Sequence, residues 1–341
     1  MAGAPSSRTD PGGPEPTRTG PGTPGPIPTV SVVVAAHARV QFLKEAVASV
    51  TAQAPDEVLV VKYTRDPELD RELTELGAVV RQSPQPFQGG KVADGIEWAR
   101  GDVVALLDDD DVFLPGKVAR LRETFADPRV IFYANRYLPF TETPPAGRGY
   151  GPVRLFRTGE GNQFREGLRP ALASCIAARR ATILPSLEVL RGLTIADHTM
   201  FMLAVTARQW MAMDQSVLTG YRVGRVAGAL RPAQSIWSRP GASAEHDIEW
   251  MLDLLDAQPD GVRATLNPMV ANAVIHLVFL TGDTRFHEYR RTMRAILKGV
   301  GIRRPLIVPS ALMFAYPVSP RLAISLNRVW KSLVGYHHHQ G

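Results

Sequence analysis

Apolar and polar residues follow two different spacings along the first part of the chain. Short, nearly unbroken apolar runs predict buried strands at residues 30–34, 58–61, 78–80 and 103–107. The segments between these runs predict helices at residues 42–50, 67–76 and 91–100. Strands that alternate with helices in this order predict an α/β fold, with a mainly parallel sheet and right-handed crossovers.

The second half of the chain has a less regular pattern. Residues 131–133 and 213–223 predict extended segments, whereas residues 141–151 are rich in proline and glycine and predict a loop. Further helices are expected at residues 196–208, 244–255, 268–280 and 285–298. The pattern therefore predicts one α/β domain over residues 29–235, followed by a helical C-terminal region over residues 236–341.

Composition changes this picture mainly at the two ends of the chain. Residues 1–28 contain eight prolines and six glycines, which predicts a disordered segment. The net charge is +6, and no acidic residue follows Glu288, although nine basic residues do. Residues 305–333 combine that charge with apolar side chains, which favours either peripheral contact with an anionic membrane or packing on the α/β domain.

The single cysteine and the hydropathy pattern limit the class of protein. Cys175 has no partner for an intrachain disulfide, and its apolar surroundings favour a buried core residue over a nucleophile. The longest uncharged stretch, residues 305–320, contains four prolines and is too short to span a bilayer. No secretory signal is expected, so the sequence predicts a cytoplasmic protein that contacts the membrane at most peripherally.

Four consecutive aspartates, Asp108 to Asp111, directly follow the apolar run at residues 103–107. Ligands of α/β sheets bind beyond the carboxyl ends of the strands, where these carboxylates are expected to lie. Crowded carboxylates repel one another unless a cation is present, and their hard oxygens suit Mg²⁺ or Mn²⁺. The cluster therefore indicates a metal and phosphate site, or else a solvated acidic loop that caps the next helix near Pro115.

Several segments together resemble the family-2 glycosyltransferases, which have the GT-A fold. The opening strand and helix of that family are matched by Val30 to Val34, Arg39, Phe42, Leu43, Ser49 and Gln53. The central block of the family is matched by Gly95, Ile96, Ala99, Gly101, Asp102 and Leu106 to Asp111. The segment that closes its catalytic domain is matched by Leu218, Tyr221 and Arg222. The D-x-D-D pattern of the family is matched by Asp108, Asp110 and Asp111. The resemblance covers roughly residues 29–225.

The resemblance implies roles for individual residues. Asp108 would contact the donor ribose and Asp110 would bind the metal, Mn²⁺ or Mg²⁺, while Asp109 or Asp111 would assist or only cap a helix. Lys91, after Gly89 and Gly90, would approach the diphosphate; the alternative is a solvated lysine at a helix start.

The resemblance also places a catalytic base. Asp197 occupies the position that supplies this base in the family, although a charge that only stabilises the helix N-terminus is the alternative. His198 would either tune Asp197 or only fill a groove.

The segments that contact the nucleotide in the family differ here. The usual Pro-Thr-Tyr-Asn is replaced by Ala35-Ala36-His37-Ala38, and the usual acidic end of the second strand by Lys62-Tyr63. Ala35, His37, Arg39 and Lys62 are assigned to the donor by position. His37 or Tyr63 would stack on the base or be an ordinary surface aromatic, and a uridine donor cannot be assumed.

These observations predict a metal-dependent inverting glycosyltransferase that uses a nucleotide-sugar donor. The acceptor would be a glycan, a lipid-linked molecule or a small molecule. The alternatives are a catalytically silent nucleotide-binding or scaffold protein on the same fold, and a metal-dependent phosphohydrolase. Nucleic-acid binding is the weakest interpretation, because the basic tail lacks interleaved aromatic residues.

Overall fold

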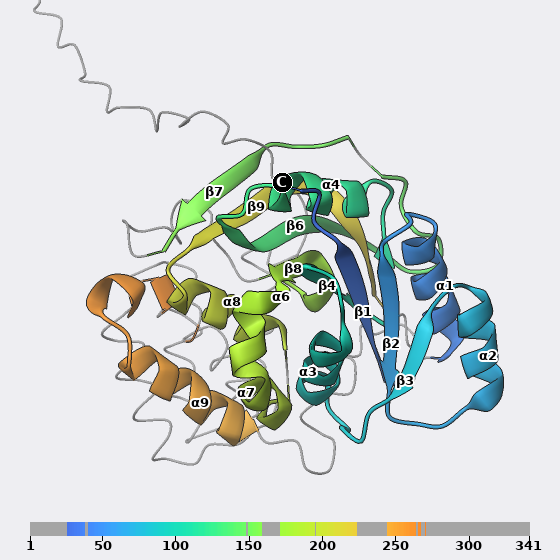
Figure 1. Ribbon diagram of the computed structural model, residues 1–341, viewed down its shortest axis with the longest axis horizontal. Coiled ribbons are helices and arrows are strands. Elements are labelled where there is room, and N and C mark those ends of the chain that lie inside the picture. The colour runs from blue at the N-terminus through green and yellow to red at the C-terminus, as the bar shows by residue number, and fades with distance from the viewer. Residues whose placement is uncertain are drawn as a thin grey trace, which may run out of the picture.

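The computed structural model describes residues 26–37, 40–147, 149–158, 171–194, 196–223, 244–263, 265, 266 and 270. Within them, a nine-stranded sheet runs through the centre in the order β3-β2-β1-β4-β8-β6-β9-β5, and β7 pairs with β9 (Figure 1). The strands are β1 (Val30–Ala36), β2 (Glu57–Lys62), β3 (Val79–Gln82), β4 (Val103–Asp108), β5 (Val112–Phe113), β6 (Val130–Phe140), β7 (Val153–Arg157), β8 (Ile176–Arg179) and β9 (Trp210–Arg222).

Helices cover the sheet on its two sides (Figure 1). The helices are α1 (Val40–Thr51), α2 (Pro67–Glu75), α3 (Gln88–Trp98), α4 (Lys117–Phe125), α6 (Arg180–Ile183), α7 (Leu187–Gly192), α8 (Asp197–Thr206) and α9 (Ala244–Asp256). Two short 3₁₀ helices, η1 (Ala173–Cys175) and η2 (Leu184–Ser186), lie beside β8 in the sequence.

The mainly parallel sheet that the sequence predicts is found in its first half. The strands β3, β2, β1 and β4 are parallel to one another. Beyond β4 the sheet is mixed, because β8 pairs antiparallel with both β4 and β6, while β6 and β9 are again parallel. The α/β class is therefore confirmed, and the antiparallel strands are confined to the part of the chain whose pattern is less regular.

Both faces of the sheet are buried, which explains the unbroken apolar runs. In β1, Val33 and Ala35 pack with residues of α3, α7, α8 and α9 on one face. Val32 and Val34 point to the opposite face and pack with residues of α1, α2 and α4. Alternate side chains of one strand therefore pack in two hydrophobic cores, one on each face of the sheet.

The predicted elements mostly agree with the structure, with a few differences in length. The extended segment predicted at residues 131–133 is the eleven-residue strand β6, because it pairs with β8 on one side and β9 on the other. The helix predicted from residue 91 begins three residues earlier, at Gln88. The described residues do not include residues 1–25, the helix predicted at 285–298 or the basic segment 305–333, and of the helix predicted at 268–280 they include only residue 270.

The C-terminal region begins as part of the same core. Ile248, Met251 and Leu252 of α9 pack in the cluster that contains residues of α3, α7 and α8. Both carboxylate oxygens of buried Asp247 also lie 3.1 Å from the backbone N–H of Thr194, which comes three residues before α8. This helix therefore supports the segment that carries Asp197. No helix in the described part of the chain is long and apolar enough for a bilayer crossing.

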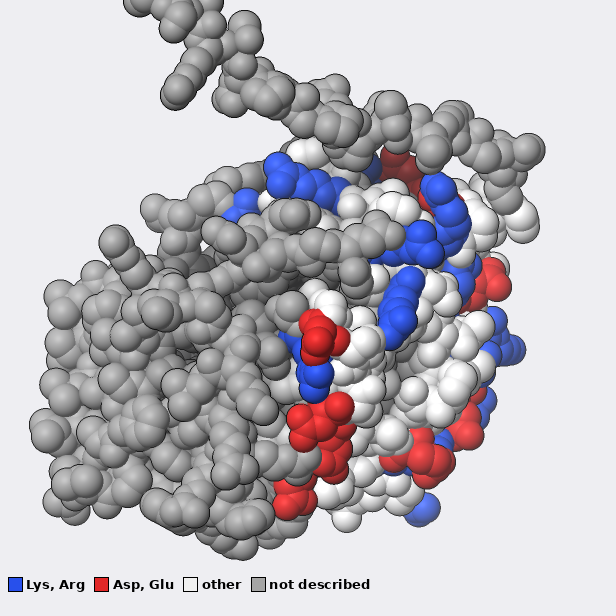
Figure 2. All heavy atoms as spheres, turned by 90° about the vertical axis from the view of Figure 1, so that its left-hand side faces the viewer, with Lys and Arg blue, Asp and Glu red and all other residues white. Residues whose placement is uncertain are grey.

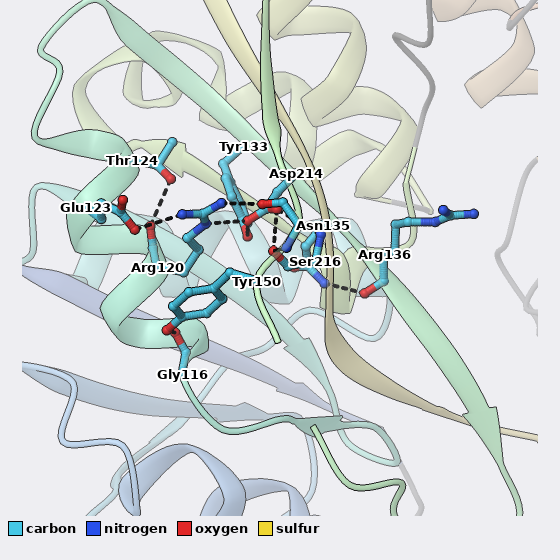
Figure 3. A network of polar contacts seen from close by, with 11 residues as sticks. Gly116, Arg120, Glu123, Thr124, Tyr133, Asn135, Arg136, Tyr150, Asp214 and Ser216 are labelled. Atoms are coloured by element: carbon cyan, nitrogen blue, oxygen red, sulfur yellow. Dashed lines mark hydrogen bonds and ion pairs between the residues drawn. The ribbon is translucent and has the colours of Figure 1, made fainter. Parts of the chain in front are cut away.

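A buried ion pair joins α4 to the β6–β9 half of the sheet (Figure 3). Arg120 donates to the carboxylate of Asp214 at 2.8 Å, and the Tyr133 hydroxyl donates to the same oxygen at 2.8 Å. The ring of Tyr150 covers the guanidinium, and the ring centre lies 4.9 Å from Cζ of Arg120. Burial opposes the charge of Arg120, but its bonds to Asp214 and Glu123 raise its pKa above the ordinary value. The network anchors the proline- and glycine-rich loop to α4.

Charges of both signs lie on the face that Figure 2 shows. Among the described residues in that view, lysine and arginine gather mainly in the upper part, and aspartate and glutamate mainly in the lower part. The net basic charge of the chain is therefore not concentrated over the described part of this face.

Candidate functional site

The candidate site lies where β1 and β4 end side by side. Ala35 of β1 is paired with Asp108 of β4, so His37 and the following aspartates lie beyond the same edge of the sheet. Because these strands are parallel, this edge is formed by their carboxyl ends, as the sequence predicts.

The four aspartates point alternately inward and outward. Asp109 and Asp111 are each 1% exposed, whereas Asp108 and Asp110 are partly exposed. The carboxylate of Asp109 accepts the backbone N–H of His37 at 2.6 Å, and that of Asp111 accepts the Ser174 hydroxyl at 2.6 Å. Asp109 and Asp111 therefore hold the loop in place, and Asp108 and Asp110 are the more exposed pair.

The interpretation of this loop as a helix cap is wrong. The next helix, α4, begins at Lys117, and its N-cap is Gly116 in the left-handed conformation at φ 89°. No side chain caps α4, and Pro115 precedes the helix instead of lying in its first turn.

Arg222, at the end of β9, fixes the backbone of the aspartate loop. Its backbone N–H donates to the Asp111 carboxylate at 2.9 Å, and its Nε donates to the Asp110 carbonyl at 2.9 Å. Its guanidinium lies between the rings of Phe42 and Phe140, at 4.2 and 4.4 Å, and also pairs with Glu45. The sequence offered only a family match for Arg222 and no sign of this positioning role.

Lys91 lies beside His37 at the end of β1. Its side chain is 1% exposed, so the interpretation as a solvated lysine is wrong. The ammonium donates to the Ala36 carbonyl at 2.9 Å and lies 2.7 Å from Nδ1 of His37. Because an ammonium can only donate, this contact makes Nδ1 the acceptor and places the proton of a neutral ring on Nε2.

The glycine pair before Lys91 has a packing role. Both glycines lie inside α3, and a Cβ at Gly89 would meet the Leu193 carbonyl oxygen at 2.1 Å. A Cβ at Gly90 would meet the side chain of Gln85 at 2.6 Å. The glycines therefore allow α3 to approach neighbouring protein segments, whereas the sequence suggested a close approach to a ligand.

Gln88 connects the aspartates to the helix that carries Asp197. Its amide nitrogen donates to the Asp108 carboxylate at 2.6 Å, and its amide oxygen accepts the backbone N–H of Ala196 at 3.4 Å. Gln88 is 8% exposed and comes from α3, so three elements meet at one side chain. Sequence reasoning missed Gln88, because a glutamine before two glycines carries no distinctive signal.

Two of the positions assigned to the donor, Ala35 and Lys62, are buried and contact other parts of the protein. Ala35 is 2% exposed and packs in the core, so its side chain cannot contact a ligand. The Lys62 ammonium is 4% exposed and pairs with Asp70 of α2, and it also donates to the Asp66 carbonyl at 3.3 Å. Arg39 lies outside the described residues.

Asp197 and His198 form a pair at the start of α8. Asp197 Oδ1 accepts the backbone N–H of His198 at 2.7 Å and lies 2.9 Å from Nδ1 of the ring. Burial alone would raise the pKa of Asp197, but the charge and hydrogen bonds of His198 lower it below the ordinary value. Burial likewise opposes the charge of His198, yet Asp197 raises its pKa above 6.5. His198 therefore contacts Asp197 instead of only filling a groove.

The two carboxylate oxygens of Asp197 have different surroundings. Within the described part of the chain, every polar contact of this carboxylate is made by Oδ1, and the side chain is 16% exposed. An ionised carboxylate with one oxygen held and the other open can accept a proton from a bound hydroxyl.

Comparison with known proteins identifies a family that this chain resembles. Residues 31–186 match the model of glycosyl transferase family 2. The chain is similar to that family over this span. A 111-residue stretch is also 30% identical to the uncharacterized glycosyltransferase alr2836 of Nostoc sp. (strain PCC 7120), and it covers 30% of this chain and 34% of that protein. The chain thus matches only about a third of the length of this relative.

Solved structures agree on the fold. Crystal structures of residues 1–349 of S. aureus TarS, one in complex with UDP-GlcNAc, match with a TM-score of 0.54 at 14% and 13% identity. The alignments cover 92% of this chain and 93% of TarS 1–349. At such low identity the likeness establishes the fold, and the predicted GT-A class is confirmed.

The family-2 site fits a divalent ion only together with a substrate. Among the described residues, no group of three or more His, Cys, Asp or Glu side chains is arranged to hold a metal by itself. Mg²⁺ is usually bound through one or two carboxylates plus substrate phosphates. Asp108 and Asp110, partly exposed beside the buried Lys91, are a donor set of that kind.

A buried lysine, Lys117, supports the aspartate loop through its contact with Ser174. Lys117 is fully buried, and its ammonium donates to the Ser174 carbonyl at 2.5 Å and to the Thr219 hydroxyl at 3.0 Å. The hydroxyl of Ser174 in turn accepts the backbone N–H of Asp108 and donates to Asp111. Burial lowers the pKa of Lys117 to about 7 and raises that of Cys175 to about 12, so Cys175 is a protonated core thiol.

The lowered pKa of Lys117 predicts a pH-dependent stability. Between pH 7 and 10.5 the unfolded chain binds more protons than the folded protein, so the free energy of unfolding rises with pH. This contribution is at most about 1.4 kcal/mol per pH unit. This contribution is absent from Lys117→Met. In urea unfolding, the free energy of unfolding of the wild type should therefore rise relative to that of the variant from pH 7 to 10. A difference that does not change with pH would contradict this assignment.

Proposed function

We propose that the protein transfers a sugar from a nucleotide-diphosphate donor to an acceptor hydroxyl, with inversion at the anomeric carbon and with help from Mn²⁺ or Mg²⁺. The observation that carries the proposal is the convergence of Asp108, Asp110, Lys91 and Asp197 on one edge of a family-2 fold, with Gln88 linking two of the elements that carry them.

The nucleotide is assigned to the end of β1. His37 and Lys91 lie there side by side, with the Lys91 ammonium 2.9 Å from the Ala36 carbonyl and 2.7 Å from Nδ1 of His37, so a positive charge stands at the end of this strand. The diphosphate would lie over Asp108 and Asp110, where a bound divalent ion would neutralise its charge as the sugar–phosphate bond breaks. UDP-GlcNAc is bound by TarS, so a UDP-sugar is the first donor to test here.

The transfer step is assigned to Asp197. The acceptor oxygen attacks the anomeric carbon while Oδ2 of Asp197 takes the hydroxyl proton, and the bond from that carbon to the diphosphate oxygen breaks. His198 holds Oδ1 and keeps the carboxylate ionised, because its positive charge favours the charged form. One displacement of this kind inverts the anomeric configuration.

Donor binding can be tested without knowledge of the acceptor. We expect one nucleoside diphosphate in a panel of UDP, GDP, ADP, CDP and dTDP to raise the thermal unfolding temperature only when Mn²⁺ or Mg²⁺ is present. A ligand at 100 times its dissociation constant stabilises the folded state by about 2.7 kcal/mol. If no nucleotide shifts the transition, the donor assignment fails.

Two further outcomes separate the other candidate functions. A metal-dependent shift without transfer to any acceptor would favour a silent nucleotide-binding protein. Metal-dependent hydrolysis of the sugar nucleotide at a phosphorus–oxygen bond, with release of a sugar phosphate at a rate that no acceptor changes, would favour a phosphohydrolase.

A further inference from the structure

Two tyrosines lie beside the aspartates on the half of the sheet that the donor does not use. Tyr137 of β6 and Tyr221 of β9 are both partly exposed, and their ring centres are 5.3 Å apart at an interplanar angle of 61°. Edge-to-face pairs of this kind form a firm aromatic surface. Neither residue belongs to the donor or base machinery described above.

The strand register places both rings at the edge where the aspartates lie. Tyr137 is paired with Thr219, and Tyr221 is two residues further along β9, so the two side chains share a face of adjacent strands. In the antiparallel pairing of β5 with β9, Val112 is opposite Gly220, and the backbone N–H of Arg222 donates to the Asp111 carboxylate at 2.9 Å. Tyr221 lies between these two contact points, so its backbone runs beside the aspartate loop.

Within the described part of the chain, the hydroxyl of Tyr221 donates to no protein group. The hydroxyl of Tyr133, by contrast, donates to Asp214. Burial and the charges of Asp111, Asp110 and Asp108 raise the pKa of Tyr221 above its ordinary value, so the O–H is retained at neutral pH.

The two halves of the site suit ligands of different charge. The charged donor is assigned to Lys91 and the aspartates, near β1 and β4, whereas the tyrosines lie past β8 in the strand order. A neutral acceptor cannot be held by charges, so it depends on apolar contact and hydrogen bonds. Tyrosine offers both, since its ring packs against the C–H face of a sugar and its hydroxyl donates to a sugar oxygen.

We propose that Tyr137 and Tyr221 bind a pyranose ring of the acceptor, which stacks on the aromatic pair and accepts a hydrogen bond from the Tyr221 hydroxyl. This inference deepens the proposed function and rests on it. It names the acceptor as a saccharide instead of an amino acid or an isolated lipid hydroxyl.

Saturation-transfer NMR on the full chain tests the pair. With UDP and diamagnetic Mg²⁺ present, saturation of the aromatic protons should reach methyl β-glucopyranoside, methyl α-mannopyranoside or N-acetylglucosamine in the wild type. Tyr137→Ala and Tyr221→Ala should abolish that transfer. Tyr221→Phe should weaken sugar binding by about 2- to 10-fold, because it removes one hydrogen bond. Tyr150→Phe, which removes a hydroxyl bound to the Gly116 carbonyl instead, is the matched control and should bind normally.

The nucleotide response of the same variants separates this inference from the proposed function. Each tyrosine variant should keep the thermal shift with UDP and Mn²⁺, which also shows that it is folded. Sugar binding that persists in both alanine variants, or is absent from the wild type, overturns the inference. Loss of the nucleotide shift in the tyrosine variants assigns the pair to the donor and overturns it as well. A wild type without any nucleotide shift rejects the proposed function, and its sugar signal still tests the pair.

Discussion

Replacement of Asp110 by asparagine is expected to abolish the Mn²⁺-dependent binding of a nucleoside diphosphate while the protein stays folded. Asp110 is partly exposed, and its backbone carbonyl, which the substitution keeps, is the group that accepts from Arg222. The substitution removes the charge of the side chain, and an amide oxygen is a far weaker ligand than a carboxylate for a hard cation. The loss of one negative charge from a crowded loop also relieves repulsion. Isothermal titration with UDP, with and without Mn²⁺, measures the effect.

Asp111→Asn is the matched control, since it changes the adjacent carboxylate in the same way. Asp111 is buried and accepts from both the Ser174 hydroxyl and the backbone N–H of Arg222. In Asp111→Asn the amide NH₂ would face a group that itself donates a hydrogen bond, so we expect a loss of about 1–3 kcal/mol in the free energy of unfolding. Metal-dependent binding that is unchanged in Asp110→Asn would show that Asp110 is not the ligand.

The sequence was sufficient to predict the first half of the sheet. Strands buried on both faces give unbroken apolar runs, and those of β1 and β4 are visible without any structure. The position of the aspartates followed directly, because a charged cluster after such a run must lie at the carboxyl end of a strand. The mixed half was harder to predict, since β6 continues past Asn135 and Arg136, where its apolar run is interrupted, and through Pro139, which cannot donate a backbone hydrogen bond.

The roles within the aspartate cluster depend on contacts that no local pattern contains. Asp111 is distinguished from Asp110 by Ser174 and by Arg222, which lies 111 residues later. Lys117 illustrates the same limit, because lysine is almost never fully buried and sequence reasoning expects it in water. Its burial is possible only because carbonyl and hydroxyl groups from η1 and β9 meet its ammonium.

Replacement of Asp197 by asparagine is expected to lower turnover by about 10²- to 10⁴-fold, which is the usual contribution of a general base. The dissociation constant for the donor should be nearly unchanged, because Asp197 acts on the acceptor hydroxyl. Steady-state kinetics with the donor found in the nucleotide screen, together with titration of the nucleotide, measure the two quantities. Normal turnover in the variant would move the base to another residue.

A control is needed because Asp197 also stands at the N-terminus of a helix, where any negative charge is favourable. Glu68 lies exposed in the first turn of α2, so Glu68→Gln removes a charge of the same kind far from the proposed chemistry. It should cost about 0.3–1 kcal/mol of stability and leave turnover unchanged.

The variant His198→Gln then tests whether Asp197 acts as a general base or only as a negative charge at the helix N-terminus. The pKa of Asp197 is lowered by its contacts with His198, so the variant should raise that pKa toward or above its ordinary value, because burial is then less opposed. A general base is active only when it is deprotonated, so the acid limb of the pH–rate profile should move to higher pH in His198→Gln. A charge that served only the helix dipole would leave that limb in place, because no proton would pass through Asp197 during the reaction.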